Sequence, residues 1–120
     1  MGTSRSIEQE NAWRAGALVY SGRPDPVWIV PEDIVESLLQ LWEELDDWSG
    51  TLPAPPALGY KGCYVQDAGL RKWTAFNGFV SLTHDRETLI KKDMARAFEK
   101  RILISAPAGT LPPWLAQQEF

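Results

Sequence analysis

A short loop near the N-terminus places an arginine and a carboxylate two residues apart between prolines: residues 21–26 read SGRPDP. Proline fixes its own φ and pushes the preceding residue towards an extended conformation, so Arg23 and Asp25 are expected to sit in a stiff loop. Arginine can bind a carboxylate or phosphate through two parallel hydrogen bonds. One interpretation is a site for an anionic small molecule at Arg23 and Asp25, walled by Tyr20 and Trp28. The other, which we favour, is that the two side chains pair with each other or cap a turn.

Cys63 and His84 are the one cysteine and the one histidine of the chain, and these residue types can form a thiolate–imidazole pair. Cys63 lies within a strand pattern, where cysteine usually behaves as a small buried hydrophobe. His84 lies at the start of a predicted helix, whose dipole disfavours a protonated imidazole. We therefore predict no catalytic role for either residue.

The chain offers no recognisable metal or cofactor motif. One cysteine and one histidine cannot build a zinc site without carboxylates, and the spacings Cys-x-x-Cys and His-x-x-x-His do not occur. The phosphate-binding patterns Gly-x-Gly-x-x-Gly and Gly-Lys-Ser/Thr are also missing from the sequence. We predict no metal and no cofactor.

Charge and hydropathy exclude two classes of partner. The 120 residues carry a formal net charge of −4, whereas binding to nucleic acid needs a basic face. No apolar run approaches the roughly 18 residues of a membrane-spanning helix. The single cysteine excludes an internal disulfide framework, and the first residues are polar. A cytoplasmic protein that binds neither nucleic acid nor membrane is therefore expected.

Two elements flank the loop. Residues 15–21 predict a strand, because three consecutive bulky side chains suit a strand that is covered on both faces. Residues 31–48 predict a helix: Pro31 suits its first turn, and two acidic residues follow at the positive end of the dipole. Its apolar side chains recur at helical spacing, namely Ile34, Val35, Leu38, Leu41, Trp42, Leu45 and Trp48.

The second half of the chain predicts an antiparallel meander followed by a helix. Strands are expected at residues 62–66, 71–76 and 79–82, and the pair Asn77-Gly78 favours a two-residue hairpin turn. A second helix is expected from Thr83 or Asp85 to Leu103. Its outer face would carry charges of alternating sign, from Lys92, Asp93, Arg96, Glu99 and Lys100.

These elements predict a small α+β domain of order β-α-β-β-β-α, with a mostly antiparallel sheet and both amphipathic helices packed on one face. Residues 1–10 are expected to form a disordered tail, residues 11–105 the domain, and residues 106–120 a tail containing proline and tryptophan. The second face of the sheet stays exposed unless the tails or another subunit cover it. The aromatic residues available for that interaction surface are Trp13, Trp114 and Phe120.

The sequence favours a small accessory or protein-interaction module without catalytic activity of its own. Its partner would be another protein or a second copy of itself, in a homodimer. Six tryptophans and the lack of a coherent catalytic set support this interpretation. The alternative is a small enzyme or ligand-binding domain that recognises an anionic small molecule through the Arg23–Asp25 loop, with Asp25 or His84 as the proton carrier.

Overall fold

The structure is a computed structural model that describes residues 12–20, 22–52, 54 and 59–116. One antiparallel sheet has the strand order β2-β1-β4-β5-β6-β7-β3. The strands are β1 (Arg14–Ala17), β2 (Val27–Ile29), β3 (Asp46–Asp47), β4 (Cys63–Gln66), β5 (Lys72–Phe76), β6 (Phe79–His84) and β7 (Glu87–Lys92). The helices are α2 (Glu32–Glu44), α3 (Ala97–Ile104) and α4 (Pro113–Ala116). The predicted α+β class with an antiparallel sheet is confirmed.

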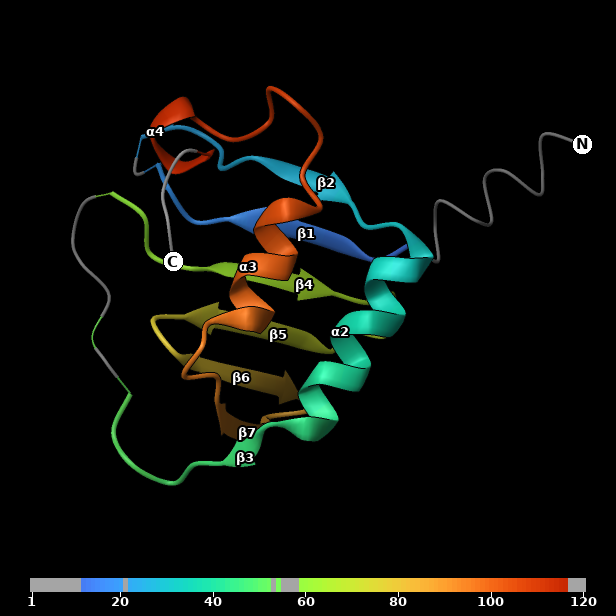
Figure 1. Ribbon diagram of the computed structural model, residues 1–120, viewed down its shortest axis with the longest axis vertical. Helices are drawn as coiled ribbons and strands as arrows, with labels where there is room; N and C mark the ends of the chain where they lie inside the picture. The colour runs from blue at the N-terminus through green and yellow to red at the C-terminus, as the bar shows by residue number, and fades with distance from the viewer. Residues whose placement is uncertain (1–11, 21, 53, 55–58, 117–120) are drawn as a thin grey trace, which may run out of the picture.

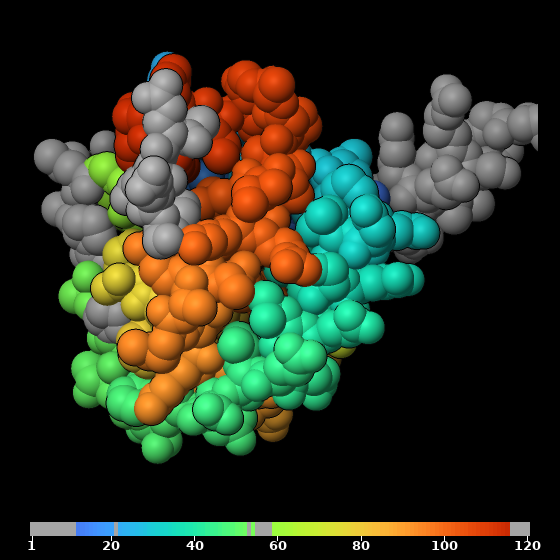
Figure 2. Space-filling view, in the orientation of Figure 1, coloured from blue at the N-terminus to red at the C-terminus, as the bar shows by residue number. Residues whose placement is uncertain are grey.

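Helices α2 and α3 contact each other and lie on the same face of the sheet (Figure 1). The space-filling view shows their side chains spread over that face (Figure 2). Their apolar sides meet the sheet in one core, because Leu38 of α2 and Phe98 of α3 are each 1% exposed, as is Val65 of β4. The core therefore forms between this one face and the two helices.

Helix α2 begins as predicted and ends earlier than predicted. Pro31 is extended just before the first turn, and the buried side chains of α2 are Val35, Leu38 and Trp42. The helix stops at Glu44 rather than at residue 48, because Asp46 and Asp47 pair with Lys92 and Lys91 of β7. The chain thereby rounds the edge of the sheet, and the ring of Trp48 lies 5.4 Å from that of Phe79 on the opposite face.

The predicted meander is confirmed. Strands β4, β5 and β6 pair in sequence. Burial alternates along β4 and β5, because odd and even positions of a strand face opposite sides of the sheet. Asn77 and Gly78 join β5 to β6 with φ values of 50° and 94°. Positive φ at both central positions is the requirement of a type I′ hairpin turn, which explains the Asn-Gly pair.

The helix predicted from residue 83 or 85 to residue 103 is wrong up to residue 96. Strand β6 continues to His84, and Asp85 and Arg86 turn the chain at φ values of 49° and 70°. Strand β7 then pairs with the whole length of β6. Asp85 and Arg86 form a second tight hairpin turn without glycine, and aspartate tolerates such a conformation better than most residues. Helix α3 starts only at Ala97.

The opposite face of the sheet lies away from α2 and α3. Its side chains alternate with the core positions and are partly exposed; from β4, β5 and β6 they include Tyr64, Gln66, Lys72, Thr74, Phe76, Phe79 and Ser81. We call this the open face. Residues 105–116 instead return to the helix side, where Leu115 is 2% exposed and joins the core. No helix among the described residues is long and apolar enough to cross a bilayer.

Candidate functional site

The Asp25 carboxylate organises the loop that follows β1. Its Oδ1 accepts hydrogen bonds from the backbone N–H groups of Val19 at 2.8 Å and Tyr20 at 2.7 Å. The guanidinium carbon of Arg23 lies 3.9 Å from the centroid of the Tyr20 ring, and Arg23 is exposed. Asp25 therefore fixes the backbone, and Arg23 remains at the surface on an aromatic platform.

Trp28 faces away from this loop. It is 7% exposed, and its Nε1 donates a hydrogen bond of 2.9 Å to the hydroxyl of Ser105 on the helix side. The structure thus brings Tyr20, Arg23 and Asp25 together but not Trp28. This arrangement agrees with the structural interpretation of the loop that we favoured from the sequence.

Cys63 and His84 are not brought together. Cys63 pairs with Ala75 and Ala75 with Val80, so His84 lies two strands away and four residues further along β6. Cys63 is fully buried, with its Sγ 3.7 Å from the carbonyl oxygen of Glu99. Burial, with the nearby Glu99 carboxylate, raises the pKa of the Cys63 thiol, which therefore stays protonated at neutral pH.

Glu99 is the centre of a buried polar cluster at the start of α3. Its side chain is 1% exposed, and Arg96 donates from Nε and Nη2 to its two carboxylate oxygens, both at 2.9 Å. The backbone N–H of Asn77 donates at 3.1 Å, and the Tyr60 hydroxyl donates to Oε2. A buried carboxylate is tolerated when it is paired and hydrogen-bonded in this way. We call Tyr60, Arg96 and Glu99 the Glu99 cluster.

Asp93 supports the cluster by capping α3. Its carboxylate oxygens accept hydrogen bonds from the backbone N–H groups of Ala97 at 2.9 Å, Phe98 at 3.0 Å and Glu99 at 3.4 Å. Asp93 is 2% exposed. The placement of Asp93 and Glu99 on a solvated helix face is therefore wrong. The overlooked signal was Asp93 itself, because an aspartate shortly before an apolar helix is typical of an N-terminal cap.

Replacing Tyr60 by phenylalanine is expected to destabilise the protein by about 1–3 kcal/mol at pH 7, because the buried Glu99 carboxylate loses a donor. Burial, together with Cys63 and Glu99, raises the pKa of Tyr60 above the value near 10 of an unfolded tyrosine. Above pH 10 the Tyr60 hydroxyl therefore ionises in the unfolded parent but not in the folded parent. The free energy of unfolding of the parent falls as a result. The parent and the variant should converge in urea unfolding between pH 7 and 11. Tyr20→Phe is the control. If the stability difference between the parent and Tyr60→Phe stays constant over this pH range and equals that of Tyr20→Phe, this role of Tyr60 is refuted.

The structure describes two of the three aromatic residues predicted for an interaction surface. Trp13 stacks on Trp73 with ring centroids 5.2 Å apart, so it extends the core rather than an interaction surface. Trp114 is 50% exposed on α4. Phe120 lies outside the described residues.

Strand β2 forms one end of the sheet and exposes apolar side chains. Val27 is 60% exposed and Ile29 is 47% exposed, and β2 contains no charged residue. The Pro26 carbonyl and the Val30 N–H bond to Ala17 and Trp13 on the β1 side. Because bonding direction alternates along an antiparallel strand, the N–H and C=O groups of Val27 and Ile29 point outward. We call this the β2 edge.

The opposite end of the sheet is formed by β3, which among the described residues pairs only with Lys91 and Lys92 of β7. Strand β3 has two residues, Asp46 and Asp47, and both are exposed. Short length and charge are the usual devices that keep an edge strand from pairing with another chain. The β2 edge is short as well but lacks the charges, so the two ends of this sheet differ in their readiness to accept a further strand.

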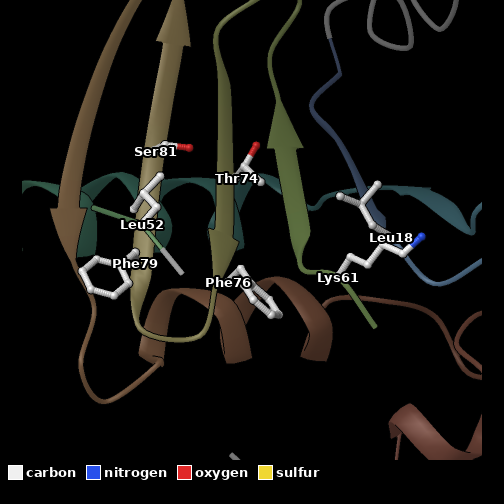
Figure 3. Close-up of a pocket in the computed structure, with 7 residues that line it drawn as sticks. All are labelled: Leu18, Leu52, Lys61, Thr74, Phe76, Phe79 and Ser81. Carbon is white, nitrogen blue, oxygen red and sulfur yellow. The ribbon is translucent and has the colours of Figure 1, made fainter. Parts of the chain in front are cut away.

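A pocket of about 240 Å³ lies on the open face (Figure 3). Thr74 and Phe76 of β5 and Phe79 and Ser81 of β6 form its floor. Leu52 contributes from the segment after β3, and Leu18 and Lys61 lie together at the other end. The lining is mainly apolar, with one ammonium and two hydroxyl groups. None of Tyr20, Arg23, Asp25 and Trp28 lines it.

The described residues contain no group of three or more histidine, cysteine, aspartate or glutamate side chains arranged to hold a metal ion. No family model, no curated protein and no solved structure matches this chain.

Proposed function

We propose that this protein is a self-associating interaction module in which β2 of one copy pairs with β2 of a second copy. The observation that carries the proposal is the β2 edge, with outward-pointing backbone groups and two exposed β-branched side chains. Addition of a strand to such an edge is a common mode of protein recognition. The acidic β3 at the other end makes β2 the favoured place for pairing.

The β2 edge is complementary to itself. We consider an antiparallel pair of β2 strands whose two-fold axis passes between the two copies of Trp28. Val27 of each copy then lies opposite Ile29 of the other. The outward N–H and C=O groups of both residues then find partners, and their side chains meet on the open face. A closed pair with one two-fold axis is the commonest form of homo-oligomer.

Charges beside β2 support the same arrangement. Arg23 precedes β2 and is exposed, while Glu32 and Asp33 follow it and are also exposed. Arg23 and Asp33 lie five residues before and after Trp28 in the chain, so we expect an antiparallel pair centred on Trp28 to direct Arg23 of one copy towards the start of α2 of the other. Opposite charges at the rim steer the encounter of two surfaces and set their register. This use of Arg23 also explains an exposed arginine held on the Tyr20 ring.

The helix side adds exposed apolar surface near the same edge. Ile104 is 79% exposed at the end of α3, one residue before Ser105, which accepts the hydrogen bond from Trp28 of β2. A second copy paired along β2 would bring this surface close to its own counterpart. The contact between copies would thus extend beyond the strands to both layers of the domain.

A binding role suits the titratable groups better than catalysis does. The cluster that the fold assembles is buried, and its members satisfy one another through hydrogen bonds. A site for an anionic molecule at the Arg23–Asp25 loop is less favoured, because the Asp25 carboxylate already holds two backbone N–H groups. The single thiol of Cys63 supports a reducing, cytoplasmic setting.

Light scattering on a sizing column at several concentrations tests the proposal. The parent is expected to show twice the chain mass of 13.5 kDa at high concentration and to dissociate on dilution. Ile29→Lys should shift the protein to the monomer mass, because a charge placed in the paired strands must be desolvated. Leu70→Lys is the matched control, since Leu70 is 73% exposed in the turn before β5. A parent that is monomeric throughout would refute the proposal.

Charge reversal tests the register of the pair. Arg23→Glu is expected to weaken the dimer, and Asp33→Arg should do the same, because each variant juxtaposes like charges between copies. The double variant Arg23→Glu/Asp33→Arg should recover most of the parent affinity. The difference should shrink in high salt, which screens exposed charges. A double variant as weak as the sum of the two single variants would exclude this register.

A further inference from the structure

We propose that the pocket on the open face binds a medium-chain carboxylate, with the alkyl chain over β5 and β6 and the carboxylate at Lys61. This inference goes beyond self-association and uses different residues, because the β2 edge does not line the pocket. The ligand class follows from the shape of the pocket, its lining and the charge at one end.

The pocket is elongated across the strands. Leu18 lies directly after β1, and Lys61 lies two residues before β4. The other strand residues of the lining belong to β5 and β6, so the lining reaches from the β1 side of the sheet to β6. Three strand spacings amount to about 14 Å. Figure 3 shows Leu18 and Lys61 at one end, Leu52 and Phe79 at the other, and Thr74 and Phe76 between them. A narrow groove of this form fits an extended chain better than a globular molecule.

The volume sets the length of that chain. One water occupies roughly 30 Å³ in the liquid, and we take this as the volume of one methylene-sized group. A pocket of about 240 Å³ then accommodates about eight such groups. The side chains of Leu18, Leu52, Phe76 and Phe79 offer apolar contacts along it. Ligand pockets are usually lined in this way, with a few polar groups that fix orientation. An alkyl chain of about eight carbons therefore fills the groove.

Lys61 supplies the charge complementarity. It lies at the end of the groove beside Leu18 and is only partly buried, and no ion pair among the described residues includes it. The backbone holds it firmly, because Lys61 N–H donates to the Leu18 carbonyl at 2.7 Å and Leu18 N–H donates to the Gly62 carbonyl at 2.8 Å. The hydroxyl groups of Thr74 and Ser81 lie on the floor. A single terminal anion fits this distribution of polar groups.

Titration of the 120-residue chain with octanoate, followed by backbone amide shifts in NMR, tests the proposal. Octanoate should bind saturably and shift amides of β5, β6 and Lys61. Affinity should rise about threefold to fourfold per added methylene from butanoate to octanoate and then level off at decanoate, since the groove is full. Octan-1-ol should bind at the same residues but more weakly than octanoate.

Lys61→Met keeps the length of the side chain and removes its charge. It is expected to weaken octanoate binding by about threefold to fivefold and to leave octan-1-ol binding unchanged, as for the loss of an exposed ion pair. Lys72→Met is the matched control, because Lys72 lies on the open face but does not line the pocket. Ile29→Lys should retain octanoate affinity, so that failure of β2 pairing and failure of this inference are distinguishable. Non-saturable binding, equal losses in both methionine variants, or shifts confined to the β2 edge would each overturn it.

Discussion

Replacing Glu99 by leucine is expected to lower the free energy of unfolding by about 3–5 kcal/mol, because one partner of a buried ion pair is removed. Three groups then lose their acceptor: the Arg96 guanidinium, the Asn77 backbone N–H and the Tyr60 hydroxyl. Arg96 stands immediately before α3, with φ 55°, three residues from position 99. Its guanidinium would therefore remain beside the leucine. The effect should appear as a lower midpoint in urea unfolding with an unchanged slope.

Two further variants distinguish the loss of the Arg96–Glu99 ion pair from the general effect of replacing a glutamate by leucine. Glu36→Leu is the surface control, since Glu36 is exposed on α2, and a change within about 0.5 kcal/mol is expected there. The double variant Arg96→Met/Glu99→Leu should recover part of the loss, because no unpaired charge remains at the site. A Glu99→Leu variant as stable as Glu36→Leu would show that the cluster does not hold the start of α3 in place.

Gly62→Ala is the second change with a large expected effect, a loss of about 2–3 kcal/mol or more. Gly62 has φ +117°, and an added Cβ would lie 2.9 Å from the backbone oxygen of Ala75 and 3.1 Å from Cβ of Phe76. Both neighbours belong to β5, which is held on each side by hydrogen bonds and cannot move freely. The variant should therefore also displace Lys61 and reduce octanoate binding.

Gly59→Ala is the control for Gly62→Ala, because Gly59 also has a positive φ, +83°, but an added Cβ would meet nothing within 4 Å. Only the conformational cost of about 1–2 kcal/mol is expected there. Thermal unfolding of both variants measures the difference. Equal losses would mean that the close approach of β5 to Gly62 contributes little.

The local signals in the sequence predicted much of the fold. Asn77-Gly78 identified a hairpin, and the apolar spacing of residues 34–42 identified a helix and its buried side. The sequence 83–96 was misinterpreted because its apolar residues, at positions 89, 90 and 94, fit a helical period as well as a strand. The hairpin turn at Asp85 and Arg86 contains no glycine to distinguish the two.

The candidate sites were less predictable, because they depend on which elements become neighbours. Tyr60, Asn77 and Glu99 are up to 39 residues apart in the chain and meet only after β4, β5 and α3 have packed. Val27 and Ile29 resemble ordinary core residues in the sequence, and their exposure follows from the place of β2 at the end of the sheet. For Asp25 the sequence favoured a structural role, and its carboxylate accepts hydrogen bonds from two nearby backbone N–H groups.

Amide hydrogen exchange of β2 at several protein concentrations is the most direct measurement of self-association through this strand. The N–H groups of Val27 and Ile29 point outward, so their exchange should slow markedly as concentration rises and the two copies pair. The N–H of Trp28 points towards β1 and should change much less. If Val27 and Ile29 exchange equally fast at all concentrations while the mass still doubles, the copies associate through another surface, and the account of β2 is wrong.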